Sequence, residues 1–358
     1  MSLKIALTHE YSWPEVRRGG ERYLHELAGA LVRRGHKVTI IGGATHASVR
    51  REEGVRVIRI ALPPFDDKRR GRVFSAEYGG LLMAGRFDIV HSLGPRDGAQ
   101  SVRAARFRKK RRTVYTDLGN PVKEWWDLQA SQAWHDLIVN EIDVYGCLSS
   151  YALECLRRDY HLEGRLTPGG VRTDVFRPMG GRASNPTLLY SGVLTEPRKG
   201  VANLLRAFED VLRCEPNAEL WLSGPGDPTE LLDAAPRVSR ERTTVLHLGA
   251  PYDQPRRYSS AWATVLPSTH EAFGLVLIES LACGTPIVAV NDAATPELIE
   301  PGIGALAQVD DDVSLADACL QAFGLARQDE IRERCRAASL AYDWDSAVAP
   351  AIERVYLG

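Results

Sequence analysis

Two glutamates stand eight positions apart in a stretch of the sequence that is otherwise almost wholly apolar. The stretch spans residues 270–290, reads HEAFGLVLIESLACGTPIVAV, and contains Glu271 and Glu279. We expect a helix over about 274–283, and its apolar side chains fall on nearly every face, which is typical of a buried helix. An ionised carboxylate in such surroundings is costly without a hydrogen-bonding partner, so Glu279 implies one. The spacing fits a binding site, but it also fits a helix-dipole role for Glu271 and a satisfied core acid at Glu279.

The segments on either side of this helix have the pattern of buried strands. A short strand is expected at 264–266 and another at 287–290, after a Gly-Thr-Pro stop. Strand, helix and strand together make a βαβ unit. In parallel sheets ligands bind at the carboxyl ends of the strands, and the loop 267–273 lies at such an end.

The start of the predicted helix suits a phosphate group. Free backbone N–H groups at Phe273, Gly274 and Leu275 would point into the crevice, where the helix dipole favours negative charge. Glu271 would then lie at the mouth of the site and Glu279 deeper along the helix.

Both halves of the chain alternate predicted strands with amphipathic helices. In the first half we expect strands at 4–10, 37–43, 55–60, 87–93 and 112–118, and a glycine-opened helix at 19–36. In the second half we expect strands at 186–192, 218–224, 243–249, 263–268 and 286–290, and a helix at 200–213. This rhythm predicts two doubly wound, Rossmann-like α/β domains that face each other across a cleft.

The predicted domain limits follow from one segment without periodicity. Residues 167–187 are rich in glycine, proline and arginine, which is typical of a linker between domains. We therefore predict a first domain at 1–168, a linker at 169–182 and a second domain at 183–344.

Bulk composition excludes several classes of protein. The chain has 358 residues, of which 44% are hydrophobic and 25% charged, so disorder and fibre-like repeats are excluded. A net charge of −1 gives no reason to expect nucleic acid as a partner. The six cysteines form no CxxC pair, and no apolar run reaches 18 residues. Residues 4–8 have the pattern of a buried strand and not of an export signal, so we expect a cytoplasmic protein with reduced thiols.

Six segments together resemble one enzyme family, the retaining glycosyltransferases of the GT-B fold, and most closely its family 4, which uses nucleotide-sugar donors. The segments are RRGGERYLHELAGALVRRGHKVTII, TPGGVRTDVFRP, LLYSGVLTEPRKGVANLLRAF, EAFGLVLIESLACGTPIVA, TPELI (295–299) and YDWDSA (342–347). The fourth matches the family's E-x7-E signature with Glu271 and Glu279. By this resemblance the last helix, near 345–358, crosses back to the first domain.

The resemblance implies a role for each glutamate and for several neighbours. Glu271 would face the hydroxyls of the donor sugar, and Glu279 would hold the nucleotide ribose. The amides of Phe273, Gly274 and Leu275 would bind the diphosphate. Other donor-site residues would be Gly192, after the first strand of the second domain, and Lys199, whose charge would stabilise the leaving diphosphate. In the first domain, Gly19 and Gly20 would let the backbone approach the diphosphate or the acceptor, and His9 is a further candidate beside that loop.

The sequence departs from the family pattern at two positions. Most members carry an arginine about six residues before the lysine, where this chain has Val193, so Arg198 is the candidate replacement. The family also places a histidine after the strand near 113–115, where this chain reads TVYTDLGNP. Asp117 is the polar candidate there.

The predicted activity is transfer of a hexose-type sugar from a nucleoside diphosphate sugar to a hydroxyl acceptor, with retention of anomeric configuration. No H-x-x-x-H, acidic D-x-D or cysteine arrangement suggests a metal, and the resemblance implies neither a metal nor a cofactor. The resemblance also implies that the donor phosphate oxygen takes the acceptor proton, so no enzyme nucleophile is required. The acceptor class is left open between a carbohydrate, a lipid and a small molecule. One alternative is a catalytically weakened nucleotide-sugar-binding subunit, which the missing arginine and histidine suggest.

A second alternative is a peripheral membrane enzyme with a lipid acceptor. It is suggested by the basic run RFRKKRR at 106–112, although a solvated helix end before a strand is the favoured interpretation. Tryptophans in the segments 10–15 and 123–134 are predicted to face the acceptor. His91 is expected to be a satisfied structural histidine.

Overall fold

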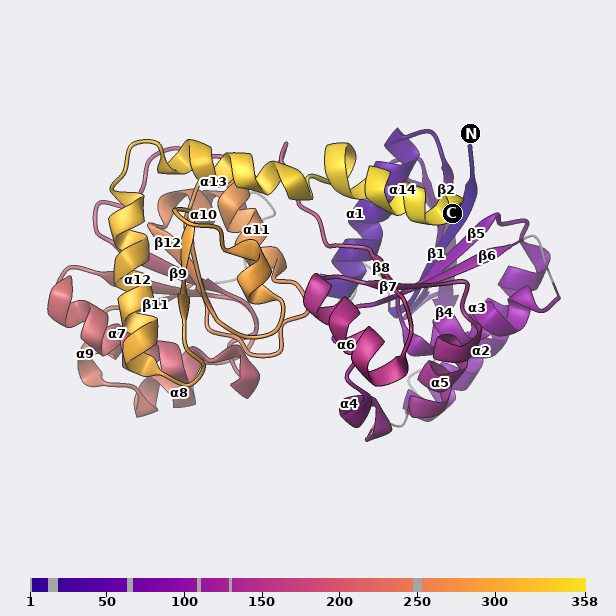
Figure 1. Ribbon diagram of the computed structural model, residues 1–358, viewed down its shortest axis with the longest axis horizontal. Helices are drawn as coiled ribbons and strands as arrows, with labels where there is room; N and C mark the ends of the chain where they lie inside the picture. The colour runs from indigo at the N-terminus through magenta and orange to yellow at the C-terminus, as the bar shows by residue number, and fades with distance from the viewer. Residues whose placement is uncertain (1, 12–18, 63–66, 108–110, 129–130, 247–252) are drawn as a thin grey trace. The chain divides into compact units, whose positions relative to one another are not determined.

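The computed structural model of the protein describes residues 2–11, 19–62, 67–107, 111–128, 131–246 and 253–358. The chain divides into two compact units (Figure 1). The first comprises Met1–Gly170 together with Trp344–Gly358, and the second comprises Val171–Asp343. Each is a separate α/β structure with its own sheet.

The first unit is built on an eight-stranded sheet in the order β3-β4-β2-β1-β5-β6-β7-β8. Its strands are β1 (Lys4–Tyr11), β2 (Lys37–Ala44), β3 (Ser48–Glu52), β4 (Val55–Ala61), β5 (Ile89–Ser92), β6 (Arg112–Asp117), β7 (Val144–Cys147) and β8 (Arg165–Leu166). Neighbouring strands are parallel except β3, which is antiparallel to β4. The strand order reverses between β1 and β5, which is where such sheets open a crevice for ligands.

Helices pack on this sheet, several of them through a stripe of buried apolar residues. They are α1 (Gly19–Arg33), α2 (Asp67–Ala84), α3 (Pro95–Ala105), α4 (Lys123–Asp127), α5 (Gln132–Glu141), α6 (Ser150–Tyr160) and α14 (Ala349–Leu357). In α1, for example, Tyr23, Leu27 and Leu31 recur every four residues and are buried. The central strands are the most deeply buried: β5 is buried along its whole length, and β1 is buried from Ile5 to Thr8.

The second unit is built on a six-stranded, wholly parallel sheet in the order β11-β10-β9-β12-β13-β14. The strands are β9 (Thr187–Ser191), β10 (Glu219–Ser223), β11 (Thr243–Leu246), β12 (Ala263–Leu266), β13 (Ile287–Val290) and β14 (Gly304–Ala307). The order reverses between β9 and β12. This is the doubly wound arrangement that the alternation of strands and helices predicts.

Its helices are α7 (Val201–Cys214), α8 (Thr229–Ala234), α9 (Arg237–Glu241), α10 (Asp253–Ser260), α11 (Leu275–Ala282), α12 (Asp312–Ala326) and α13 (Ile331–Ser339). The short 3-10 helices are Pro197–Lys199, Thr295–Leu298 and Leu340–Tyr342. Leu204, Phe208 and Val211 of α7 and Phe323 of α12 join the strands in one core. The predicted helix at 274–283 is α11, with Gly274 and Cys283 as its two caps.

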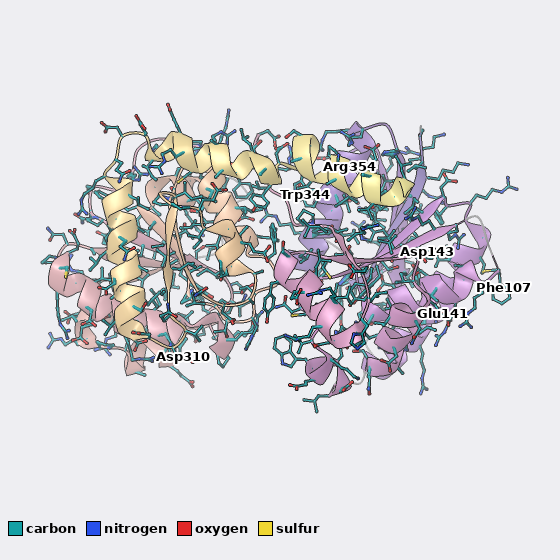
Figure 2. All side chains as sticks on the ribbon, viewed as in Figure 1. Phe107, Glu141, Asp143, Asp310, Trp344 and Arg354 are labelled. Atoms are coloured by element: carbon teal, nitrogen blue, oxygen red, sulfur yellow. The ribbon has the colours of Figure 1, made fainter. Side chains whose placement is uncertain are left out.

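The C-terminal segment belongs to the first unit. After a π-helix at Trp344–Val348, α14 packs Tyr356 into the core, where its hydroxyl lies 2.8 Å from Nδ1 of His91. The other ring nitrogen of His91 lies 2.7 Å from the hydroxyl of Thr116, and burial lowers the pKa of His91 to about 3. His91 is therefore the satisfied structural histidine that was expected. Trp344 is also buried, against Tyr23 (Figure 2).

The boundary between the units falls near the start of the predicted linker at 169–182. It lies at Gly170–Val171, and most of the predicted linker packs within the second unit. The amide of Val171 donates to Tyr342, that of Met179 to Ser259, and Arg182 donates to two backbone carbonyls. A glycine-rich composition removes periodicity, but it does not prevent a segment from being fixed by hydrogen bonds.

The cysteines and the helix lengths agree with what the sequence predicts. None of the six cysteines is in a disulfide. The last part of the predicted strand at 243–249 lies outside the described residues. Among the helices of the described ranges, none combines the length and hydrophobicity that a membrane span requires.

Candidate active site

Two loops meet where the second sheet reverses its strand order. One follows β9 and contains the 3-10 helix Pro197–Lys199, and the other follows β12. The amide of Thr269 donates to the carbonyl of Arg198 at 3.0 Å. Gly200 has φ +69°, and a Cβ there would lie 2.2 Å from the carbonyl oxygen of Pro267. Only glycine allows both that conformation and that approach, so Gly200 holds the two loops together.

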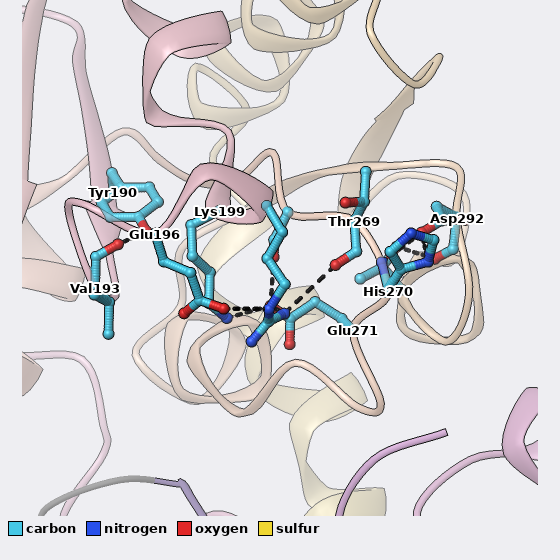
Figure 3. Close-up of polar contacts among 11 residues, drawn as sticks. Tyr190, Val193, Glu196, Lys199, Thr269, His270, Glu271 and Asp292 are labelled. Carbon is cyan, nitrogen blue, oxygen red and sulfur yellow. Dashed lines mark hydrogen bonds and ion pairs between the residues drawn. The ribbon is translucent and has the colours of Figure 1, made fainter. Parts of the chain in front are cut away.

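The carboxylate of Glu271 is the centre of the polar contacts between these loops. Its Oε1 accepts from the Lys199 ammonium at 2.5 Å, from the Ser268 hydroxyl at 2.5 Å and from Arg198 at 3.4 Å. Lys199 and Glu271 turn toward each other in Figure 3. Arg198 also pairs with Glu196. The structure thus brings together three predicted residues, and it adds Ser268 and Glu196, which were not predicted.

The ion pairs keep Glu271 charged. Burial alone would raise the pKa of this carboxyl, but the Lys199 charge, hydrogen bonds from Lys199 and Ser268, and the Arg198 charge outweigh it, so the pKa of Glu271 is lowered. The side chains of Lys199 and Glu271 are each 14% exposed, whereas that of Arg198 is 41% exposed. The lysine is therefore the more firmly held cation.

The backbone before α11 is shaped as the phosphate prediction requires. Gly274 is the N-cap residue with φ +101°, a conformation that favours glycine. Phe273 is buried and its ring packs edge-on against Tyr342. Within the described residues, the amides of Phe273, Gly274 and Leu275 donate to no protein acceptor, as expected for the start of a helix. These amides remain available to an anion.

Glu279 has the polar partner that its burial implies. The hydroxyl of Tyr258 donates to its Oε2 at 2.9 Å, and both residues are buried. Glu279 lies on α11 behind the amides just described.

The backbone after β9 leaves little space for side chains. A Cβ on Gly192 would lie 2.8 Å from the Tyr190 hydroxyl, which itself donates to the Val193 carbonyl at 2.7 Å. The amide of Gly192 donates to Ser223, so the ends of β9 and β10 are joined. Val193 is 36% exposed, and it supplies no charge at the position where the family resemblance leads us to expect an arginine.

Sequence reasoning missed a hydrogen-bonded group at the same edge. The Gln254 side chain joins Ser191 at 3.0 Å to Ser223 at 3.3 Å, across the ends of β9 and β10. Arg257 donates to Ser223 at 2.9 Å. The only feature of the sequence that indicates this group is the spacing of Gln254 and Arg257. They are three positions apart, so both lie on the same side of α10.

In the first unit, His9, Gly19 and Gly20 lie at the carboxyl edge of the sheet. His9 is near the end of β1, and its Nδ1 lies 3.8 Å from Glu21. Gly19 and Gly20 begin α1, where a Cβ on Gly20 would lie 2.5 Å from Leu118 Cδ1, just after β6. These three residues, predicted as an acceptor or phosphate loop, are thus grouped near the point where the strand order reverses. The preceding residues 12–18 lie outside the described ranges.

Asp117 ends β6 at that edge, but its carboxylate is engaged inside the domain. Oδ2 accepts from the Tyr145 hydroxyl at 2.8 Å and Oδ1 from the amide of Gly119 at 2.9 Å. Burial raises its pKa. His135 lies behind, with Nε2 at 2.7 Å from the same tyrosine oxygen. These partners give Asp117 a structural role, and its role in the active site stays a prediction.

The predicted tryptophans and the basic run are divided between core and surface. Trp126 stacks on His135 with ring centroids 4.1 Å apart, Trp134 carries Arg96 over its ring, and Trp125 is partly exposed. Trp13 and residues 108–110 lie outside the described ranges.

In the basic run at 106–112, Arg106 pairs with Glu141, and Phe107 is exposed (Figure 2). The basic run was expected to be solvated, but Arg111 is buried. Its guanidinium donates to two backbone carbonyls near the end of α2. The described part of the run is therefore no continuous basic surface.

No group of three or more His, Cys, Asp or Glu side chains within the described ranges is placed to hold a metal ion. The arrangement instead offers cations, carboxylates and helix-start amides in one place. Such a set suits a ligand with both phosphate and hydroxyl groups.

Comparison with known proteins agrees with this chemistry over nearly the whole chain. Residues 17–175 match the model of Glycosyltransferase Family 4, and residues 185–324 match that of Glycosyl transferases group 1. The phosphatidyl-myo-inositol mannosyltransferase of Mycobacterium leprae is 28% identical over 372 residues, which cover 99% of this chain and 96% of that protein. The same-named protein of Propionibacterium freudenreichii is 25% identical over 389 residues, covering 99% and 94%.

Solved structures show the same fold. Sucrose-phosphate synthase from Thermosynechococcus elongatus is similar with a TM-score of 0.80 at 22% identity, covering 99% of this chain and 98% of that one. HepE from Anabaena, in complex with UDP and glucose, is similar with a TM-score of 0.77 at 19% identity, covering 99% and 100%. With both domain models matched in order and the E-x7-E pair in place, the chain belongs to the family 4 glycosyltransferases, which have the GT-B fold.

Proposed function

We propose that this glycosyltransferase moves a hexose-type sugar from a nucleoside diphosphate to a hydroxyl group, with retention at the anomeric carbon. The observation that carries the proposal is the cluster of Lys199, Arg198 and Glu271 beside the amides that precede α11. A diphosphate gains negative charge as its bond to the sugar breaks. Cations held in place there stabilise the transition state more than the ground state.

Each residue of the cluster has a distinct part in this proposal. Lys199, assisted by Arg198, binds the diphosphate, which also receives hydrogen bonds from the amides of residues 273–275. Glu271 faces the sugar hydroxyls, and Glu279 faces the ribose. Gly192 lets the backbone approach the donor closely. Because Glu271 already neutralises Lys199, the incoming diphosphate shares a cation that the protein has positioned in advance.

The proposed chemical step needs no nucleophile from the protein. The bond from the anomeric carbon to the phosphate oxygen breaks, and the acceptor oxygen bonds to the same carbon on the same face. The acceptor proton passes to the departing phosphate oxygen. We propose that no metal and no cofactor take part, because Lys199, Arg198 and the α11 amides supply the positive field.

The acceptor is proposed to bind to the first unit, at the edge formed by His9, Gly19 and Gly20. Relatives named phosphatidyl-myo-inositol mannosyltransferase support mannose as the first sugar to test and a lipid-linked inositol as the first acceptor. We propose a cytoplasmic enzyme, which reaches a lipid acceptor at the membrane surface.

A second candidate function is that of a sugar-nucleotide-binding subunit with little turnover. Val193 leaves one cationic contact missing, and Arg198, its replacement, is 41% exposed and already paired with Glu196. Weakened transition-state stabilisation with intact donor binding would follow from this arrangement.

One experiment separates the two. The melting temperature of the protein is measured with UDP-, GDP-, ADP- and dTDP-sugars, since a ligand that binds only the native state raises it. Donors that raise it are then assayed for transfer to phosphatidylinositol and to free sugars. Binding with transfer supports the enzyme, binding without transfer supports the subunit, and no binding by any donor contradicts both.

A further inference from the structure

Tyr258 is a fully buried tyrosine whose hydroxyl contacts a buried acid, Glu279. It is 0% exposed, and its hydroxyl donates to Glu279 Oε2 at 2.9 Å. Burial, followed by the nearby Glu279 charge, raises the pKa of Tyr258 well above its ordinary value. The phenol therefore keeps its proton and acts as a permanent donor.

The protein fixes this tyrosine from several sides. Its carbonyl accepts from the Thr285 hydroxyl at 2.7 Å, and its ring packs against Phe176 with centroids 6.2 Å apart. Its neighbour Ser259 accepts at its carbonyl from Arg332 at 3.1 Å. The position of the hydroxyl is thus set by the backbone and by packing, and not by Glu279 alone.

We propose that Tyr258 is a positioning residue that holds the Glu279 carboxylate in the one orientation that accepts the ribose hydroxyls of the donor. This inference rests on the proposed function, which places the ribose at Glu279. A carboxylate has about four lone-pair sites, so it can accept hydrogen bonds from a ribose diol while it also accepts one from Tyr258. Fixing the acid in advance lowers the cost of ordering it when the donor binds.

If Tyr258 has a positioning role, its removal should lower affinity for the ribose and not for the nucleotide as a whole. If Tyr258 acts through Glu279, removing its hydroxyl weakens contacts to ribose but leaves contacts to base and diphosphate intact. A merely structural role would weaken every nucleotide alike. Ribonucleotides and their 2′,3′-dideoxy analogues distinguish these cases, because only the former carry the hydroxyls.

The test measures Kd by titration calorimetry for UDP, GDP and ADP, and for the dideoxy analogue of whichever binds most tightly. We expect wild type to prefer the ribonucleotide by about tenfold or more, the scale of hydrogen bonds to a charged group. In Tyr258→Phe the preference should fall by about fivefold or more. Tyr356→Phe is the matched control, since it also loses a buried phenol contact, to His91 in the other unit, and should keep the wild-type preference.

A double-mutant cycle that combines Tyr258→Phe with Glu279→Gln keeps the inference testable if Tyr258→Phe alone does not fold. Replacing both partners removes the buried charge together with the Tyr258 hydroxyl that it binds, so the double variant should fold even where Tyr258→Phe alone does not. The double variant should show the same small preference as Glu279→Gln alone. A further loss in the double variant overturns the inference.

The outcomes also separate this inference from the proposed function. A wild type that binds none of the three diphosphates overturns both. A wild type that prefers ribonucleotides, with a Tyr258→Phe variant that weakens both analogues equally, overturns only the positioning role. Loss of preference in Tyr258→Phe with dideoxy affinity unchanged supports it.

Discussion

The Lys199 ammonium and the Glu271 carboxylate lie 2.5 Å apart, although the two residues are 72 positions apart in the sequence. Each comes from a loop that follows a strand next to the reversal point of the second sheet. The fold therefore brings a cation and an anion to the same edge before any substrate is bound. Both side chains are largely buried, so their interaction is less screened by salt than that of a surface pair.

Loss of the lysine should affect turnover more than folding. Lys199→Ala removes the better-buried of two cations from the proposed diphosphate site, and we expect kcat to fall by about a hundredfold or more. The measurement is the rate of transfer from the donor identified by thermal shift. A variant with wild-type kcat would exclude Lys199 from transition-state stabilisation.

Substitution of Arg198 tests whether this arginine replaces the cationic contact that Val193 does not supply. Arg198→Ala should lower kcat measurably, because among the described residues Lys199 is the only other cationic side chain paired with Glu271. Val193→Arg should raise the activity of Arg198→Ala. If Arg198→Ala matches wild type, Arg198 is a surface residue and its pairing with Glu196 has no catalytic consequence. If wild type is inert with every donor it binds and Val193→Arg activates it, the subunit interpretation is correct.

Glu279→Gln should weaken binding of the nucleotide-sugar donor without unfolding the protein. The amide keeps the size of the side chain but removes the charge, and hydrogen bonds to a charged group contribute roughly 1.5–3 kcal/mol. We expect donor affinity to fall about tenfold or more in titration calorimetry. Unchanged affinity would contradict the assignment of Glu279 to the ribose.

Gly200→Ala should disturb the contact between the two loops. It places a Cβ 2.2 Å from the Pro267 carbonyl oxygen at φ +69°, whereas Gly180→Ala meets nothing within 4 Å at φ +72°. The matched pair shares the backbone strain of about 1–2 kcal/mol and differs in the clash. Thermal unfolding should therefore show a larger loss for Gly200→Ala, accompanied by weaker donor binding. Equal losses would mean that the loops separate without cost.

The central elements of the second domain could be predicted from the sequence, because the patterns that indicate them are local. Continuous apolar strands, a helix that is apolar on every face and the stop at Gly284 are enough to place β12, α11 and β13. The edge strand β3 was missed, since SVRRE has no apolar pattern and becomes a strand only by pairing with β4. Helix α2 was missed as well, because three glycines interrupt its apolar periodicity.

The site was predictable only where its residues are marked by their neighbours in sequence. Glu271 and Glu279 stand out because they interrupt an apolar run. Tyr258 and Gln254 do not, since their function depends on partners that only the fold brings near. Asp117 was placed correctly at a strand end, but its engagement by Tyr145 depends on a neighbouring strand and was not visible.

The final prediction concerns Asp97, an acid of the first unit that is buried at the start of α3. It accepts from the Thr8 hydroxyl at 2.7 Å and from the Leu93 amide at 3.3 Å, yet burial outweighs these bonds and raises its pKa from 3.8 to about 7. Between these two values the folded protein binds more protons than the unfolded chain, so the stability contributed by this group is complete below the lower value and is lost as pH rises through the higher one.

Asp97→Asn removes this titration while keeping the shape of the side chain. Relative to wild type, the variant should therefore gain stability by up to about 1.4 kcal/mol per pH unit as pH rises through this window, when urea unfolding is compared between about pH 5 and about pH 8. The control is Asp174→Asn, because Arg172 lowers the pKa of Asp174 and this acid stays ionised throughout that range. Its stability difference from wild type should be constant with pH. Parallel pH profiles for wild type and Asp97→Asn would mean that Asp97 keeps an ordinary pKa in the folded protein, and that its buried carboxylate is stabilised by more than the Thr8 and Leu93 contacts.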